Sequence, residues 1–200
     1  MIAHRLRRLV AVPAVAVLLA LAPAAGAQAK AATLDFNLDP ATTAVHWTLN
    51  ATGHAVHGTF KLKNGAVSID PSTGNASGLI VIDATSGESG DASRDSHMHK
   101  VVLESDRYPA ITFRPTHVAG KVALDATGPI TVDGVMNLHG QDHPLQLTVN
   151  LHPNSSGLAS QTHFVIPYIA WGLKDPSFMM FRVEKQVAID IDATAAPTQR

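Results

Sequence analysis

The 200-residue chain has no cysteine, few aromatic residues and almost no net charge. Without cysteine it forms no disulfide bond, and no lipid can be attached to a cysteine behind the N-terminal apolar segment. Aromatic residues make up 5% of the chain, and 15 Lys and Arg nearly balance 16 Asp and Glu. A nucleic-acid-binding protein needs a basic face, so this composition argues against a nucleic-acid partner.

No apolar run is long enough for a comfortable membrane span of about 20 residues. Residues 9–21 form an apolar run interrupted only by Pro13, and Arg5, Arg7 and Arg8 precede it. Two small-x-small patterns follow, Ala25-Gly-Ala27 and Ala27-Gln-Ala29, which are typical of signal peptidase sites. We therefore predict a cleaved signal peptide over residues 1–29 and a periplasmic or secreted protein, with a retained N-terminal anchor as the alternative. The remaining chain has twelve basic and sixteen acidic residues, a formal charge near −4.

Catalytic motifs are also missing. The chain has no Gly-x-Ser-x-Gly sequence, and its many serines lie in predicted turns, where serine acts as a turn former. No pair of carboxylates stands out at predicted strand ends. The sequence therefore predicts a protein that is not an enzyme and that needs no cofactor.

The rest of the chain shows the alternation of half-buried β-strands. Val45, Trp47 and Leu49 alternate with polar residues, and residues 144–151 place four apolar side chains on one face. Strands are predicted over residues 45–49, 59–63, 66–70, 78–83, 110–114, 121–124, 129–138, 144–151, 162–167 and 186–192. Asn64-Gly65 predicts a hairpin turn. Residues 94–106 predict one or two helical turns, with Met98, Val101 and Val102 facing inward, and residues 195–200 predict a frayed tail. This pattern predicts one all-β domain over residues 34–194, either a sandwich or a barrel.

A series of short motifs occurs in a fixed order. They are Leu38-Asp-Pro40, Gly53-His-Ala-Val-His-Gly-Thr-Phe60, Asn64-Gly65, Ile69-Asp-Pro71, Arg94-Asp95, Tyr108-Pro-Ala-Ile-Thr-Phe113, Val132-Asp-Gly134, Leu138-His-Gly140 and Val187-Ala-Ile-Asp-Ile191. Together, from about Asp35 to Ala193, they resemble the YceI-like family of exported lipid-binding proteins. Arg94-Asp95 belongs to a polar, glycine-containing crossover, residues 86–100, between two predicted strands.

The resemblance implies an extended, antiparallel, eight-stranded, lipocalin-like β-barrel with a short helical crossover. It also implies a polyisoprenoid or similarly long apolar ligand in the lumen, and it supplies no catalytic residue. Two segments depart from the commonest family pattern. Thr42-Thr43 stands where a His-Ser pair is frequent, and residues 166–177 resemble one branch of the family instead of its best-known members.

Six aromatic residues spread over separate elements are the predicted apolar lumen contacts: Trp47, Phe60, Phe113, Trp171, Phe178 and Phe181. The alternative is that they fill a closed core. For Arg94 and Asp95 we predict a structural role at the barrel rim, with Arg94 paired to Asp83 or Asp95. Contact between Arg94 and a lipid head group is the alternative.

Eleven histidines include three close pairs: His54/His57, His97/His99 and His139/His143. Residues i and i+2 of a strand point the same way, so His97 and His99 would share a face if that segment were extended. Zinc needs three or four ligands, and no cluster of carboxylates or cysteines completes such a set. No metal site is therefore predicted.

These observations predict an exported binding protein that sequesters or carries a long isoprenoid-type lipid, either a polyprenyl chain or an isoprenoid quinone. The predicted partner is this small apolar lipid, and the sequence is compatible with a homodimer. The rival hypothesis is a periplasmic metal-handling or stress-response protein that uses its histidines.

Overall fold

The computed structural model describes residues 33–180 and 182–198 of the protein, which are mostly β-strand. The predicted signal peptide, residues 1–29, lies outside the described residues. The elements in chain order are β1 (Leu34–Leu38), β2 (Ala44–Ala51), β3 (His54–Ile69), β4 (Ala76–Glu88), α1 (Ala92–His97), the π-helical turn η1 (Met98–Val102), β5 (Ala110–Ala119), β6 (Gly128–Leu138), β7 (Gln141–Asn154), β8 (Gly157–Ile166) and β9 (Val187–Pro197).

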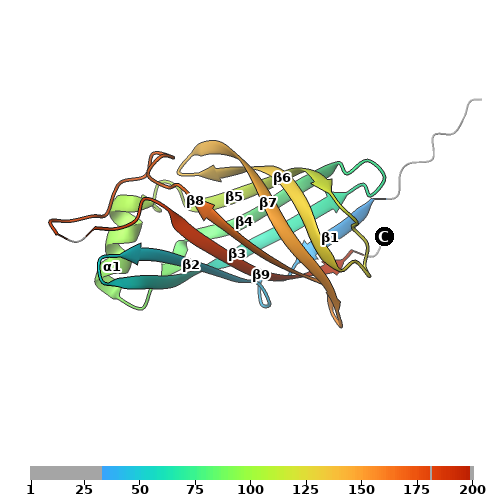
Figure 1. Ribbon diagram of the computed structural model, residues 1–200, viewed down its shortest axis with the longest axis horizontal. Coiled ribbons are helices and arrows are strands. Elements are labelled where there is room, and N and C mark those ends of the chain that lie inside the picture. The colour runs from blue at the N-terminus through green and yellow to red at the C-terminus, as the bar shows by residue number, and fades with distance from the viewer. Residues whose placement is uncertain (1–32, 181, 199–200) are drawn as a thin grey trace, which may run out of the picture. The chain divides into compact units, whose positions relative to one another are not determined.

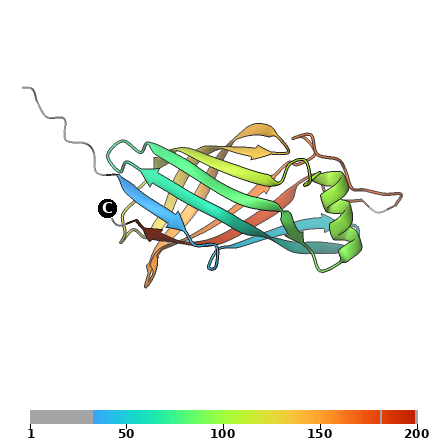
Figure 2. The ribbon, with the colours of Figure 1, turned by 180° about the vertical axis from the view of Figure 1, so that it is seen from behind.

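Strands β2 to β9 close into an eight-stranded antiparallel barrel. Each strand pairs with its neighbour in the chain, and β9 pairs back onto β2. Figures 1 and 2 show the tilted strands wrapping around a common axis, with α1 across one end. The predicted all-β barrel with a short helical crossover is confirmed.

Strand β1 extends the line of β2 and was not predicted. It pairs with the end of β3 (Phe36 with Val67) and the end of β9 (Phe36 with Pro197), whereas β2 pairs with earlier parts of both strands. The prediction of a frayed tail is therefore wrong for residues 195–197. These residues form backbone pairs with β1, and the amide of Thr198 donates to the carbonyl of Asp35 at 2.8 Å.

The predicted hairpin at Asn64-Gly65 is also wrong, because β3 runs through it as one 16-residue strand. Leu62 pairs with Ile82 and Asn64 with Val81, so Lys63 is an extra residue in a β-bulge. Strand β4 lies beside both halves of β3, and this pairing overrides the local turn preference. The chain reverses instead after Ile69, over residues 71–74.

Residues 121–124 do not form the predicted strand. They belong to the loop between β5 and β6, in which Val122 and Ala126 are buried. Both side chains join a cluster of inward-facing residues: Phe36, Ile69, Val118, Ile130, Leu151 and Leu158. This loop fills the end of the barrel opposite to α1.

The helical prediction for the crossover is confirmed at the other end of the barrel. Asp91 caps α1, because its carboxylate accepts hydrogen bonds from the amides of Ser93 (3.0 Å) and Arg94 (2.9 Å). Three further connections lie at the same end of the barrel as α1 (Figure 1): the β2–β3 turn, the β6–β7 turn and the β8–β9 connection, residues 167–186. We call this side the α1 end.

Candidate functional site: the barrel lumen

Alternation along each strand gives the barrel an apolar interior. On β9, Val187, Ile189, Ile191 and Ala193 line the lumen, while Asp190 and its outward-facing neighbours lie on the outer surface. The same rule holds on β7, where Leu147 and Leu151 are buried and the residues between them include exposed ones. The inward-facing side chains of one face are therefore sufficient to build a continuous apolar wall.

Two cavities lie inside this wall. The larger one, about 790 Å³, occupies the α1 end, and the smaller one, about 210 Å³, occupies the opposite half. On five strands the wall passes from the larger to the smaller cavity between two successive inward-facing residues: Trp47 and Val45, Phe60 and Leu62, Leu138 and Met136, Ile166 and Phe164, and Ile189 and Ile191. Ile111 lines both cavities, so they lie next to each other inside the barrel.

The lumen is long. The lining on β9 runs from Val187 to Ala195, about 26 Å along the strand at roughly 3.3 Å per residue. A strand tilt of about 40° reduces this to about 20 Å along the barrel axis. The shape therefore suits a chain-like molecule better than a compact one.

Of the six aromatic residues predicted to contact a ligand in the lumen, the structure places four in the cavity walls. Trp47, Phe60 and Phe178 line the larger cavity, and Phe113 lines the smaller one. Trp171 lines neither. Its ring stacks on the imidazole of His143, with centroids 4.1 Å apart and planes 2° apart, and it packs against a core cluster that includes Phe113 and Met136. Phe181 lies outside the described residues.

Three of these aromatic rings rest on glycines of a neighbouring strand segment. A Cβ atom added to Gly58 would meet the indole of Trp47, one on Gly87 would meet the ring of Phe60, and one on Gly134 would meet the ring of Phe113, each within 3.0 Å. Real Cβ atoms essentially never come this close. Each glycine therefore makes the space in which an inward-facing ring packs against the backbone. The indole N–H of Trp47 is buried and has no hydrogen-bond partner, so packing alone holds this ring.

The aliphatic residues of the strands that line the lumen were not predicted as lumen contacts. Leu138, Ile166 and Ile189 are buried in the larger cavity wall, and Met98 and Val102 reach it from η1. The alternation of β6, β8 and β9 was visible in the sequence and would have placed the first three. The prediction that Met98 and Val102 face inward from the helical crossover is confirmed.

Polar side chains line only part of the larger cavity, close to α1. Asp91, Ser93, Arg94 and His97 come from the N-terminal cap and first turns of the crossover, and His54 comes from the start of β3. All five residues are exposed. The lumen therefore has a polar mouth at the α1 end.

Arg94 and Asp95 are joined through Ser89. Arg94 donates from Nε to Ser89 Oγ (2.7 Å) and from Nη2 to the Ser89 carbonyl (3.0 Å), and the same hydroxyl donates to Asp95 Oδ1. The predicted pairing of Arg94 with Asp83 or Asp95 is wrong within the described part of the chain. Asp83 instead accepts from the hydroxyl and amide of Thr85, which lower its pKa.

The β8–β9 connection is held against the α1 end by a charged group. His139 Nε2 lies 2.8 Å from Glu104 Oε2, and Lys174 Nζ lies 3.5 Å from Glu104 Oε1. These contacts, with the His139 hydrogen bond as the largest cause, hold the pKa of Glu104 below its usual value. Tyr168 donates to the Glu184 carbonyl at 2.8 Å, and burial raises its pKa to about 12.

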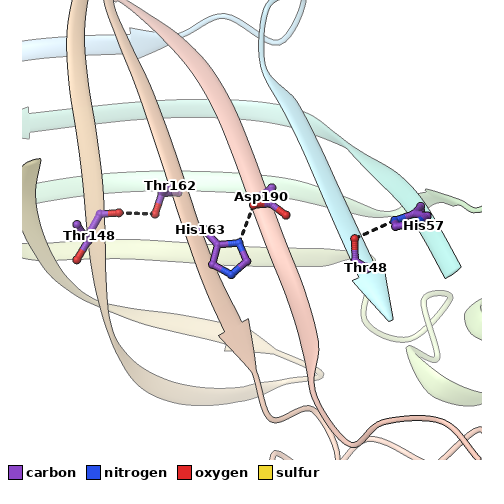
Figure 3. A network of polar contacts seen from close by, with 6 residues as sticks. All are labelled: Thr48, His57, Thr148, Thr162, His163 and Asp190. Atoms are coloured by element: carbon purple, nitrogen blue, oxygen red, sulfur yellow. Dashed lines mark hydrogen bonds and ion pairs between the residues drawn. The ribbon is translucent and has the colours of Figure 1, made fainter. Parts of the chain in front are cut away.

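The histidine pairs do not meet as metal ligands in the described residues, where no three His, Cys, Asp or Glu side chains form a possible metal site. His97 and His99 lie in helical segments, and both ring nitrogens of His99 are engaged, with Ser105 Oγ (2.9 Å) and the Gly87 carbonyl (2.8 Å). On the outer face, His57 bonds to Thr48 and His163 to Asp190 (Figure 3). These contacts crosslink neighbouring strands.

A closed antiparallel barrel around an apolar lumen with a polar mouth is the architecture of lipocalin-type binding proteins. In the described residues, no helix is long and apolar enough to cross a bilayer. The model of the YceI-like domain matches residues 36–195, and the chain belongs to the YceI-like family. Among curated proteins, no sequence matches it.

Solved structures share the fold at low sequence identity. BcnA from Burkholderia cenocepacia is 18% identical, with a TM-score of 0.64, over 80% of this chain and 99% of BcnA. A polyisoprenoid binding domain from Saccharophagus degradans, implicated in plant cell wall breakdown, is 15% identical, with a TM-score of 0.63, over 82% and 99% of the two chains. The YCEI protein of Campylobacter jejuni is 15% identical, with a TM-score of 0.55, over 72% and 86%.

Proposed function

We propose that the protein binds one long apolar lipid of the isoprenoid type, a polyprenyl chain or an isoprenoid quinone, inside its barrel. The observation that carries the proposal is the pair of adjacent apolar cavities inside the barrel, which share the lining residue Ile111. Membership of the YceI-like family and the fold shared with a polyisoprenoid binding domain support the class of ligand.

The energetics favour an apolar chain. Each CH₂ group moved from water into the lumen contributes roughly 0.8 kcal/mol. Ordering the chain and losing its free motion offset part of this gain. A ligand that fills only the larger cavity would leave the apolar wall around Phe113 and Met136 unused, so a longer chain should bind more tightly. A polar head group would lie at the mouth, near Arg94 and His97.

We further propose that the protein acts by sequestration or transport, without catalysis and without a cofactor, and that it works in the periplasm or outside the cell. The support for export is the pattern of residues 1–29, with its basic start, its apolar run and its small-x-small sites.

The test is organic extraction and mass spectrometry of protein purified without detergent from cells that make isoprenoid lipids. The proposal expects about one isoprenoid-type lipid per protein molecule. A variant with Ile111→Trp, which places a larger side chain where the two cavities adjoin, should retain much less lipid. The matched control is Val165→Trp, because Val165 is exposed on the outer face of β8. A wild-type barrel that remains empty after exposure to these lipids would refute the proposal.

A further inference from the structure

The β8–β9 connection carries a short apolar tip at the α1 end. Phe178, Met179 and Met180 are 71%, 78% and 87% exposed, more than any other large hydrophobic residue in the described chain. In Figures 1 and 2 this connection, drawn in orange-red, extends beyond α1 and away from the strands. Three adjacent exposed hydrophobic side chains of this size are unusual on a protein surface and mark a site of interaction.

The base of the tip is fixed to the barrel. Ser177 Oγ accepts from the Val183 amide (3.0 Å), and Val183 forms a β-bridge with Ala51. The carbonyl of Arg182 accepts from the Thr52 amide (2.8 Å), and the Arg182 amide donates to Thr52 Oγ1 (3.0 Å). The apolar residues are thus presented from a base that hydrogen bonds hold in place, so their exposure does not come from an unattached loop.

The tip adjoins the opening of the lumen. Pro176, Phe178 and Val183 line the larger cavity together with α1 residues such as Arg94. A surface that accepts the tip would therefore lie directly against the mouth. This position matters for a very apolar ligand, because a ligand that passes from surface to lumen here is not exposed to bulk water.

The charges beside the tip suit a phospholipid surface. The connection carries Lys174, Arg182 and Lys185, against Asp175 and Glu184. Lys174 lies 3.5 Å from Glu104 Oε1, so Arg182 and Lys185 are the cations of the connection beside the tip, and the five groups together carry a formal charge of +1. Apolar side chains beside basic residues are the combination that holds proteins in the interface of anionic bilayers.

We propose that residues 178–180 insert into the surface of a phospholipid bilayer and dock the lumen mouth on the membrane. The apolar tip supplies most of the attachment, and the neighbouring cations add a preference for anionic lipid. This inference goes beyond ligand binding, because a barrel that carries a lipid through water needs no such tip.

The experiment measures co-sedimentation of the protein with vesicles of phosphatidylcholine alone and of phosphatidylcholine mixed with phosphatidylglycerol, both free of isoprenoids. Wild-type protein should sediment with both, and more with the anionic vesicles. The triple variant Phe178→Ser, Met179→Ser and Met180→Ser should lose at least about tenfold in partition coefficient. The control variant Leu124→Ser, which changes an exposed leucine at the opposite end, should bind like wild type.

The absence of cysteine allows a second measurement on the intact fold. A polarity-sensitive dye on Met179→Cys should shift to the blue when vesicles are added, whereas the same dye on Leu124→Cys should not. Wild-type protein that stays in the supernatant, or that binds through residue 124, overturns the proposal. A dimer in sedimentation velocity that the triple variant abolishes, without vesicle binding, also overturns it and assigns the tip to a second copy. Lipid extraction tests the proposed ligand and vesicle sedimentation tests the proposed docking. An empty lumen and a failure to bind vesicles are therefore separate results.

Discussion

Gly58→Ala is the sharpest test of how the lumen is built, because the added methyl group has no room. Its Cβ would meet the backbone carbonyl of Glu88 on one side and the indole ring of Trp47 on the other, both within 3.0 Å. Gly58 has ordinary strand geometry and pairs directly with Trp47. The cost therefore comes from overpacking and not from backbone strain. The carbonyl cannot rotate away, so β3, β4 or the indole must shift.

Inserting a methyl group into a packed interior typically costs about 1–3 kcal/mol. We expect Gly58→Ala to lie in the upper half of this range, because one of the two contacts is with the backbone. For a domain of this size each kcal/mol lowers Tm by about 2–4 °C. The expected fall in Tm is therefore about 4–12 °C, measured by circular dichroism or calorimetry.

Gly65→Ala is the matched control on the same strand. Its nearest neighbour would be Leu38 Cβ at 3.1 Å, a tight but adjustable side-chain contact. The smaller conformational freedom of alanine in the unfolded chain also favours the folded state, so the net change should be small. The pair Gly58→Ala and Trp47→Phe should be less destabilising than the sum of the two single changes. A Gly58→Ala variant no less stable than the Gly65→Ala variant would show that position 58 has room for a methyl group.

Three further predictions concern titration and ligand detection. Because the hydrogen bond from His139 lowers the pKa of Glu104, the charged carboxylate stabilises the fold at neutral pH, and this contribution is lost as pH falls through the lowered pKa. The variant Glu104→Gln should therefore show a smaller fall in Tm on the acid side of a Tm–pH profile. An unchanged slope contradicts this prediction. In a spectrophotometric titration, one tyrosine should ionise only near pH 12, and Tyr168→Phe should remove that step; if the step persists, the assignment is wrong. With two tryptophans in the chain, lipid binding should change the fluorescence of a Trp171→Phe variant, which retains the lumen residue Trp47, and should have less effect on a Trp47→Phe variant.

The sequence predicted the barrel because alternation is a local property. Val45 and Trp47 lie on the same face of a strand whatever their partners are, and the structure places both inside. The motif order then selected a barrel over a sandwich. The hairpin at Asn64-Gly65 failed because a local turn signal competes with the pairing of a whole neighbouring strand, which the sequence does not display.

The site was harder to predict than the fold. Trp47, Phe60 and Phe113 lie on regular strands, so alternation could place them in the lumen. Trp171 lies in an irregular connection that has no period, and its stacking on His143 depends on tertiary packing. The role of Gly58, Gly87 and Gly134 could not be predicted from the sequence either, because only the register between strands shows which glycine faces which ring.

The seam between β1 and β9 has a consequence for how the chain folds. Leu38 pairs with Ala195 and Phe36 with Pro197, so the first and last strands meet across nearly the whole domain. Contacts between residues this far apart in sequence form slowly. During synthesis the barrel cannot close before β9 has emerged, because residues 188–192 pair with β2, and until then the edges of β2 and β8 lack their shared partner. A chain whose last strand is incomplete therefore keeps two unpaired strand edges, which are sites of aggregation.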